Sequence, residues 1–131
     1  MSQASSSIDY SKYVALKLSN ADGIMTVTIS NPGKKNAVTP RMSEELAIIW
    51  EDLWMDPEVR VIILTGDGND FCSGADLAGI SARHGTAPPS RLTHPTTRVA
   101  RKHVMGIIEC EKPVIAKVRG VAYGLGINMA L

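Results

Sequence analysis

Two short segments of this sequence place small residues where backbone N–H groups could bind a ligand and take part in a reaction. Residues 71–77 (FCSGADL) follow an apolar stretch that ends at Thr65, and residues 120–128 (GVAYGLGIN) follow a second one that ends at Val118. Both are predicted junctions between a strand and a helix. In open α/β folds, ligands bind outside the carboxyl ends of the strands. Small residues there let a ligand approach the N–H groups at the start of the next helix.

Two such junctions on neighbouring strands could direct two N–H donors at one point, which is the geometry of an oxyanion hole. This geometry suits a thioester, because its carbonyl oxygen gains negative charge when an enolate forms. Removing one donor from a comparable site costs about 2.7–4 kcal/mol of transition-state stabilisation. Two alternatives stay open: the glycines are ordinary turn residues, and Asp76 caps the helix that follows it.

Other kinds of site find less support in the sequence. Residues 124–126 (GLG) do not complete a GxGxxG dinucleotide fingerprint, because Met129 stands where the third glycine belongs. Ser73 lies in CSG and not in a GxSxG nucleophile elbow. We predict no metal site, because the histidines lack the spacing of metal ligands; they are His84, His94 and His103.

Hydrophobic periodicity predicts the elements that carry the junctions. Residues 14–18 and 25–29 alternate apolar and polar side chains around the turn-forming segment 20–23 (NADG), so a β-hairpin with one solvated face is expected. Thr39 and Pro40 begin a predicted helix that ends before Pro57. Its apolar face comprises Met42, Leu46, Ile49, Trp50 and Leu53.

The second half of the chain alternates strands and helices. Short apolar runs at 59–65 and 114–118 are typical of strands buried on both faces. A polar loop is expected at 82–95, followed by an amphipathic helix around residues 100–108, and a final helix follows the segment at 120–126. This order predicts right-handed βαβ crossovers and a parallel sheet.

The composition is that of a globular protein. The chain has 131 residues, 44% hydrophobic and 21% charged, and a net charge of +1, so charge offers no argument for binding nucleic acid or an anionic membrane. Cys72 and Cys110 are isolated, and we predict free thiols in a reducing compartment. Residues 1–12 resemble a flexible leader without the apolar core of a secretory signal, so a cytoplasmic location is expected. The apolar residues 129–131 at the end suggest a fragment.

Four segments, in order, resemble the crotonase (enoyl-CoA hydratase/isomerase) superfamily. Residues 71–77 are similar to its F-x-x-G-A/G-D-L motif. Residues 112–120 (KPVIAKVRG) are similar to K-P-V-I-A-x-V-x-G, and 124–126 continue as the glycine-rich turn. Residues 31–37 (NPGKKNA) resemble the N-terminal R-P-x-x-x-N-A loop. The resemblance covers residues 14–131, and the four segments together make it specific.

The resemblance implies an α/β fold, a crotonase-like spiral of ββα units that is incomplete in this chain and occupies residues 13–131. It implies acyl-CoA thioester substrates, no cofactor besides the coenzyme A of the substrate, and a homotrimer or hexamer for the full-length protein. By position, Ala75 and Leu125 would donate the two oxyanion-hole N–H groups. The other residues placed along coenzyme A by the resemblance are Lys34, Lys35, Ala37, Asp76, Leu77 and Ala78.

Two positions depart from the family pattern. The family often has glycine where Leu125 stands, and a backbone donor tolerates this change if φ stays negative. In hydratases the position of Asn128 carries the first catalytic glutamate, and asparagine has no ionisable carboxylate with which to act as a general base. Asn128 could instead orient a water or hold a carbonyl, which favours an isomerase that works with one carboxylate.

The leading hypothesis is therefore an acyl-CoA-processing enzyme of the enoyl-CoA hydratase/isomerase type (a lyase or isomerase), in which Ala75 and Leu125 stabilise a thioester enolate. The 131-residue piece alone is expected to be inactive. Alternatives are another crotonase reaction, such as hydrolysis or decarboxylation of a CoA thioester, or a non-catalytic CoA-binding protein. A dinucleotide-dependent reductase is a third and weaker alternative.

Overall fold

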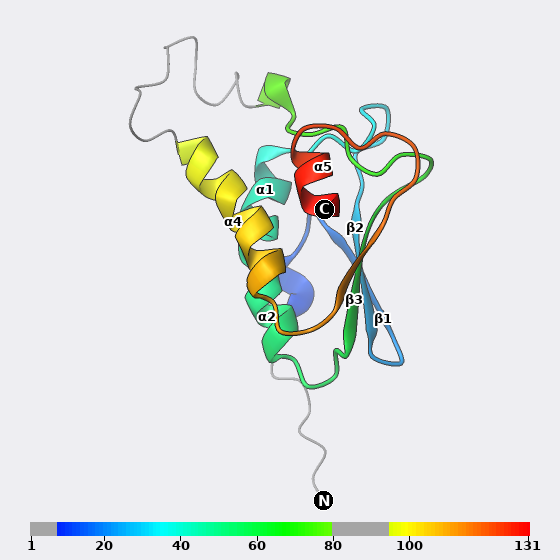
Figure 1. Ribbon diagram of the computed structural model, residues 1–131, viewed down its shortest axis with the longest axis vertical. Helices are drawn as coiled ribbons and strands as arrows, with labels where there is room; N and C mark the ends of the chain where they lie inside the picture. The colour runs from blue at the N-terminus through cyan, green and yellow to red at the C-terminus, as the bar shows by residue number, and fades with distance from the viewer. Residues whose placement is uncertain (1–7, 80–94) are drawn as a thin grey trace, which may run out of the picture.

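A four-stranded mixed sheet forms the framework of the protein. The structure is a computed structural model that describes residues 8–79 and 95–131 (Figure 1). The strands follow one another across the sheet in the order β1-β2-β3-β4. The pair β1·β2 is antiparallel, whereas β2·β3 and β3·β4 are parallel, as the sequence predicted. Their bounds are β1 Lys17–Ala21, β2 Ile24–Ile29, β3 Val61–Gly66 and β4 Val114–Lys117.

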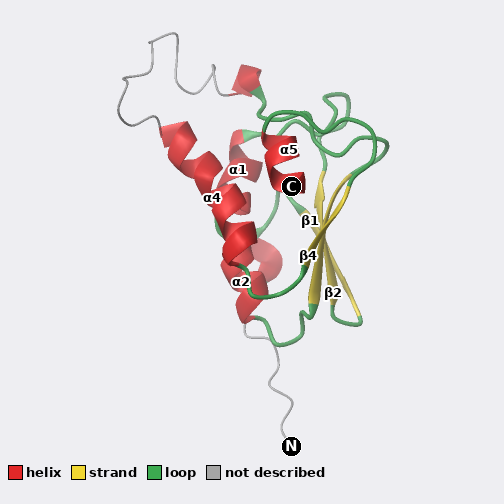
Figure 2. Ribbon diagram, in the orientation of Figure 1, coloured by secondary structure: helices red, strands yellow, loops and turns green. Residues whose placement is uncertain are grey.

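The helices of the described residues gather on one side of this sheet (Figure 2). They are the 3-10 helix η1 Tyr10–Lys12 and the helices α1 Pro40–Leu46, α2 Ile49–Met55, α4 Pro95–Glu109 and α5 Leu125–Ala130. This arrangement leaves part of the other face open: Ile63 is half-buried and Ile115 is 53% exposed. The prediction that β3 and β4 are buried on both faces is therefore wrong for the described part of the chain.

The predicted hairpin is present, with β1 displaced toward the turn, from Lys17 to Ala21. Asp22 and Gly23 both have positive φ (52° and 83°), as a tight hairpin turn requires. β1 begins at Lys17 because the preceding backbone has another partner. The N–H groups of residues 14–16 donate to the two carboxylate oxygens of the buried Glu45, at 2.9–3.1 Å.

The single helix predicted between Thr39 and Pro57 is divided into α1 and α2. The Thr39 side chain caps α1 by accepting the Met42 N–H at 3.2 Å, as expected from the Thr-Pro pair. At Ile48 the N–H bonds the Glu45 carbonyl, an i−3 bond that tightens the chain before α2. No proline or glycine marks this break, so periodicity alone did not reveal it.

The end of the predicted leader also belongs to the folded structure. Residues 1–7 lie outside the described residues, but residues 10–12 form η1. The Tyr10 hydroxyl donates to Asp56 Oδ2 at 2.6 Å, and the Tyr13 hydroxyl donates to Asp52. Both tyrosine side chains pack against the core and hydrogen-bond to carboxylates. These contacts explain why residues 10–12 are folded although the sequence predicted a flexible leader.

The core lies between the sheet and the helices. Alternate residues of β2 and β3 point into it and meet the apolar faces of α1 and α2. Its fully buried members include Val27, Ile29, Leu46, Ile49, Leu53, Ile62, Leu64 and Phe71. Helix α4 packs closely on this layer, because Gly106 brings its backbone against the buried Trp50 ring. A Cβ atom at Gly106 would lie 2.4 Å from Trp50 Cδ1.

We expect Gly106→Ala to destabilise the fold by about 1–3 kcal/mol, because overpacking outweighs the better helix propensity of alanine. Urea unfolding monitored by circular dichroism measures this change. Arg101→Ala is the matched control on an exposed position of α4 and should leave the free energy of unfolding nearly unchanged. Equal stability of the Gly106 variant and the parent would contradict the packing argument.

A buried histidine joins α4 to α1. His103 is 1% exposed, and its Nε2 lies 2.8 Å from the Ser43 carbonyl oxygen. Burial lowers the pKa of His103 below its ordinary value of 6.5. The unfolded chain therefore takes up a proton at His103 before the folded protein does.

The stability that the neutral His103 contributes should consequently be fully present above a pH of about 6.5. It should be lost as the pH falls below that value. The measurement is the unfolding free energy between pH 5 and pH 8 for the parent and for His103→Gln, which keeps a donor but does not titrate. The parent should lose more stability than the variant on acidification. Parallel pH profiles would show that His103 does not contribute.

Candidate active site

Two loops that follow neighbouring strands lie side by side at one end of the sheet. The first runs from β3 through residues 71–77, and the second runs from β4 through residues 118–124 to α5. A parallel bridge between Cys72 and Ala122 joins them. The Tyr123 N–H donates to the Cys72 carbonyl at 3.0 Å. The sequence prediction that the two junctions lie on adjacent strands is confirmed.

In the first loop, the N–H group of Ala75 points away from the neighbouring residue Val38. Val38 forms a parallel bridge with Ala75 in which its N–H bonds the Gly74 carbonyl (2.7 Å) and its carbonyl accepts the Asp76 N–H (2.9 Å). In a parallel ladder the middle residue of such a trio points its own N–H to the opposite side. The Ala75 N–H therefore faces away from Val38. Gly74 makes the turn possible with a φ of 103°.

The second loop brings the start of α5 close to the first. Gly124 precedes α5 with a φ of 54°, and Leu125 is its first residue. A Cβ atom at Gly126 would lie 2.2 Å from the Cys72 carbonyl oxygen, so only glycine permits this approach. The first N–H groups of a helix have no partner within the helix. The Leu125 N–H is such a group.

The two loops approach each other closely beside these N–H groups. A Cβ atom built on Gly74, the residue before Ala75, would lie 3.7 Å from the Leu125 nitrogen. Neither the Ala75 N–H nor the Leu125 N–H donates to another group of the described residues. Two free donors on adjacent loops can bind one oxygen atom that carries negative charge, which is the chemistry of an oxyanion hole.

The lysine-containing loop 31–37 borders the first junction. Lys34 Nζ lies 3.5 Å from Asp76 Oδ2, and the Ser73 hydroxyl donates to the Lys34 carbonyl at 3.0 Å. Lys35 Nζ lies 3.6 Å from Asp70 Oδ2, whereas Ala37 is buried. The structure thus brings the predicted lysines to the same edge as Asp76.

The remaining predicted site residues lie around the two loops. Asp76 Oδ1 accepts the Gly79 N–H at 3.4 Å at the start of a helical turn, so the capping role left open for Asp76 is present. Leu77 and Ala78 are exposed on this turn. Asn128 is exposed on α5, three positions after Leu125.

Sequence reasoning missed two side chains that hold these loops. Asn36 is 3% exposed with a φ of 57°, and its Nδ2 donates to the carbonyls of Asp67 and Asp70, both at 2.8 Å. Asp70 Oδ1 accepts the Val121 N–H at 2.8 Å. Both residues lie in turn-rich segments, which do not indicate long-range contacts. The sequence pointed only to Asn36, through the N-A pair in the loop that resembles the family motif.

Other candidate chemistry is limited in the part of the chain that the structure describes. Cys72 and Cys110 are free thiols, as predicted, and burial raises the pKa of the Cys72 thiol, which keeps it protonated. No cluster of metal-binding side chains occurs among residues 8–79 and 95–131. His84 and His94 lie outside the described residues. Among the described helices, none is both long and apolar enough to cross a membrane.

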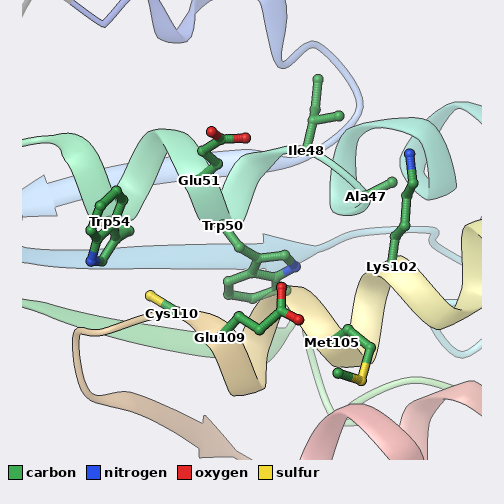
Figure 3. Close-up of a pocket in the computed structure, with 10 residues that line it drawn as sticks. Ala47, Ile48, Trp50, Glu51, Trp54, Lys102, Met105, Glu109 and Cys110 are labelled. Atoms are coloured by element: carbon green, nitrogen blue, oxygen red, sulfur yellow. The ribbon is translucent and has the colours of Figure 1, made fainter.

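One hollow lies beside this region, and another lies elsewhere among the described residues. One, of about 520 Å³, is bordered by loop 31–36 and turn 67–70, with Lys35 in its wall. The other, of about 480 Å³, lies between α2 and α4 and is lined by side chains that include Trp50, Trp54 and Met105 (Figure 3). None of the residues that line this second hollow belongs to the two junctions.

The comparisons with known proteins agree with the class of protein that the α/β fold and its two adjacent loops indicate. The family model described as "Enoyl-CoA hydratase/isomerase" matches residues 19–131. The protein named "Probable enoyl-CoA hydratase EchA14" of Mycobacterium tuberculosis is 34% identical over 120 residues, which cover 92% of this chain and 45% of that protein. The 1,2-epoxyphenylacetyl-CoA isomerase of Escherichia coli (strain K12) is 34% identical over 109 residues, 83% of this chain and 41% of that protein.

A solved structure gives the same result for the fold. The crystal structure of an enoyl-CoA hydratase/isomerase from Mycobacterium paratuberculosis superimposes with a TM-score of 0.76 at 30% identity, covering 88% of this chain and 45% of that chain. The chain belongs to the enoyl-CoA hydratase/isomerase family. It spans less than half the length of these relatives. The predicted α/β, crotonase-like fold is confirmed, and this chain forms part of it.

Proposed function

We propose that the full-length protein binds an acyl-CoA thioester with its carbonyl oxygen between the N–H groups of Ala75 and Leu125. The observation that carries this proposal is the pair of neighbouring backbone donors with no partner among the described residues. Backbone N–H groups held in this way stabilise an oxyanion more than a neutral carbonyl, because the charge on the oxygen grows along the reaction.

The reaction that suits this site is proton transfer next to a thioester carbonyl. Two hydrogen bonds to the oxygen lower the energy of the enolate, so a carboxylate elsewhere in the protein can remove and return the proton. Asn128 does not titrate, and its amide would orient a water or hold a carbonyl beside this carboxylate. The chemistry needs no cofactor besides the coenzyme A of the substrate.

Coenzyme A would lie along the edge formed by Asp76, Leu77 and Ala78, with its nucleotide end beside loop 31–37. The side chains of Lys34 and Lys35 are more than half exposed, and ammonium groups attract phosphates. The hollow beside Lys35 supports this placement. Each lysine also pairs with an aspartate, Asp76 or Asp70, so phosphate would compete with a weak, exposed ion pair.

We extend the proposal to the setting of the enzyme. The full-length protein would form a homotrimer or hexamer in the cytoplasm and act in fatty-acid or related acyl-CoA metabolism. The net charge of +1 of this chain offers no electrostatic argument for nucleic acid or an anionic membrane as a partner. Sedimentation of the full-length protein tests the oligomeric state.

Calorimetry with two matched ligands tests the carbonyl site. A non-hydrolysable acyl-CoA analogue that keeps the carbonyl should bind the full-length protein more tightly than the thioether in which CH₂ replaces C=O. Two hydrogen bonds of about 0.5–1.5 kcal/mol each predict a difference of roughly 5-fold to 150-fold in Kd. Equal affinities would show that the carbonyl does not lie between these donors.

Asn128 supports a second candidate within the family, namely another CoA-thioester reaction such as hydrolysis or decarboxylation. A non-catalytic CoA-binding protein is the alternative outside enzymes. Product analysis separates these functions: free coenzyme A indicates hydrolysis, carbon dioxide indicates decarboxylation, and binding without any product indicates the non-catalytic protein.

A further inference from the structure

Asp70 occupies the point where the two loops of the proposed site and loop 31–37 meet. Its carboxylate oxygen Oδ1 accepts the Val121 N–H of the second loop at 2.8 Å. Its backbone carbonyl accepts the Asn36 amide at 2.8 Å, and its Oδ2 lies 3.6 Å from Lys35 Nζ. One residue therefore contacts all three segments that surround Ala75 and Leu125.

The contact with the second loop holds a whole peptide in place. While Asp70 binds the Val121 N–H, the Val121 carbonyl accepts the N–H groups of Phe71 and Cys72, each at 3.0 Å. The chain approaches so closely here that a Cβ atom on Gly120 would lie 2.5 Å from Asp70 Oδ1. Val121 is four residues before Leu125, and the Cys72–Ala122 bridge and the Tyr123 N–H bond to the Cys72 carbonyl continue this contact toward α5.

The contact with loop 31–37 acts on the other donor. Asn36 joins this loop to the turn at Asp67 and Asp70, and the loop continues into Val38, whose hydrogen bonds to Gly74 and Asp76 orient the Ala75 peptide. Asp70 is thus linked to the Leu125 N–H through its side chain and Val121, and to the Ala75 N–H through its backbone carbonyl and Asn36.

We infer that Asp70 is a positioning residue that sets the spacing of the Ala75 and Leu125 N–H groups. It acts through the backbone and does not touch the substrate. The inference rests on the proposed function, because the spacing matters to catalysis only if both groups bind one oxygen. A displacement of about 1 Å in such a site can lower the rate by about 10²-fold.

The test uses the full-length protein with four variants. Asp70→Ala removes the acceptor for Val121, Asp70→Glu moves it by one methylene, and Asp70→Asn keeps an oxygen acceptor of the same reach. Glu58→Ala is the matched control, because Glu58 is exposed and precedes β3, at the end of the sheet opposite the two loops.

We expect kcat to fall by about 10-fold to 10²-fold in Asp70→Ala and Asp70→Glu, with KM changed less than about threefold, because the loss concerns the transition state. Asp70→Asn and Glu58→Ala should stay near the parent. The second readout is the infrared frequency of a ¹³C-labelled thioester carbonyl, which hydrogen bonds lower. It should return toward the value of the free ligand in Asp70→Ala and Asp70→Glu.

The outcomes separate this inference from the proposed function. If the parent protein does not shift the carbonyl frequency, the proposed oxyanion hole is wrong. If the parent shifts it and both Asp70→Ala and Asp70→Glu retain the shift and kcat, the role of Asp70 is wrong. If Asp70→Ala does not fold, Asp70→Glu decides: a folded protein with parental kcat and carbonyl shift overturns the inference.

Discussion

Replacing Ala75 with proline should lower turnover of an acyl-CoA by about 10²–10³-fold in the full-length protein, because it removes one of the two proposed donors. The fold should survive, since the Ala75 N–H takes no part in the bridge to Val38. That bridge uses the Gly74 carbonyl and the Asp76 N–H, and both remain in the variant. Ala75 is not among the residues with positive φ, a conformation that proline excludes.

The control is Ala75→Gly, which keeps the N–H group and should retain turnover within a few-fold of the parent. Thermal unfolding and circular dichroism of both variants check the fold. Parental turnover by a folded Ala75→Pro variant would falsify the role given to this donor. Loss of turnover in Ala75→Gly as well would mean that the side chain, and not the N–H group, matters.

The second large effect concerns Asn128. Hydration in this family, by resemblance, needs a water activated between two carboxylates, and Asn128 stands where the first one belongs. We expect the unmodified full-length protein to isomerise a 3-enoyl-CoA faster than it hydrates a 2-enoyl-CoA, because isomerisation can use one base twice. Asn128→Glu should then raise hydration of crotonyl-CoA, by up to about 10²–10⁴-fold if the new carboxylate acts as a full general base.

Two variants control for the position of the new charge. Ile127→Glu places a carboxylate on the neighbouring exposed position of α5 and should not raise hydration. Asn128→Gln lengthens the side chain without adding a base. Hydration by the unmodified protein that is already fast, and that Asn128→Glu leaves unchanged or reduces, would show that position 128 has a different role.

The sequence by itself determined the features that depend on near neighbours. The alternation of Met25, Val27 and Ile29 predicted a strand because side chains of a strand alternate between its faces. Thr39 and Pro40 predicted the start of α1 because a cap bonds residues within one turn. The glycines at 74 and 124 marked the two loops because their backbone conformations, with positive φ, favour glycine.

Only the tertiary structure decided how these parts meet. The division of the predicted helix into α1 and α2, the late start of β1 at Lys17 and the ordered η1 arise from partners about 30 to 46 residues away in the chain, or from a local turn without a sequence signal. Glu45 illustrates this: its position in the sequence indicates an ordinary helix residue, whereas the fold places three backbone N–H groups around its carboxylate.

The same distinction applies to the candidate site. The sequence predicted roles for Ala75, Leu125 and Asn128 from their places after strands and from resemblance, but not the distance between the two proposed donors. That distance depends on the parallel register of β3 and β4 and on contacts such as Asp70 with Val121, which are 51 residues apart. Long-range contacts of this kind form only when the chain packs, because no pattern within a few residues specifies which distant backbone group a carboxylate will reach.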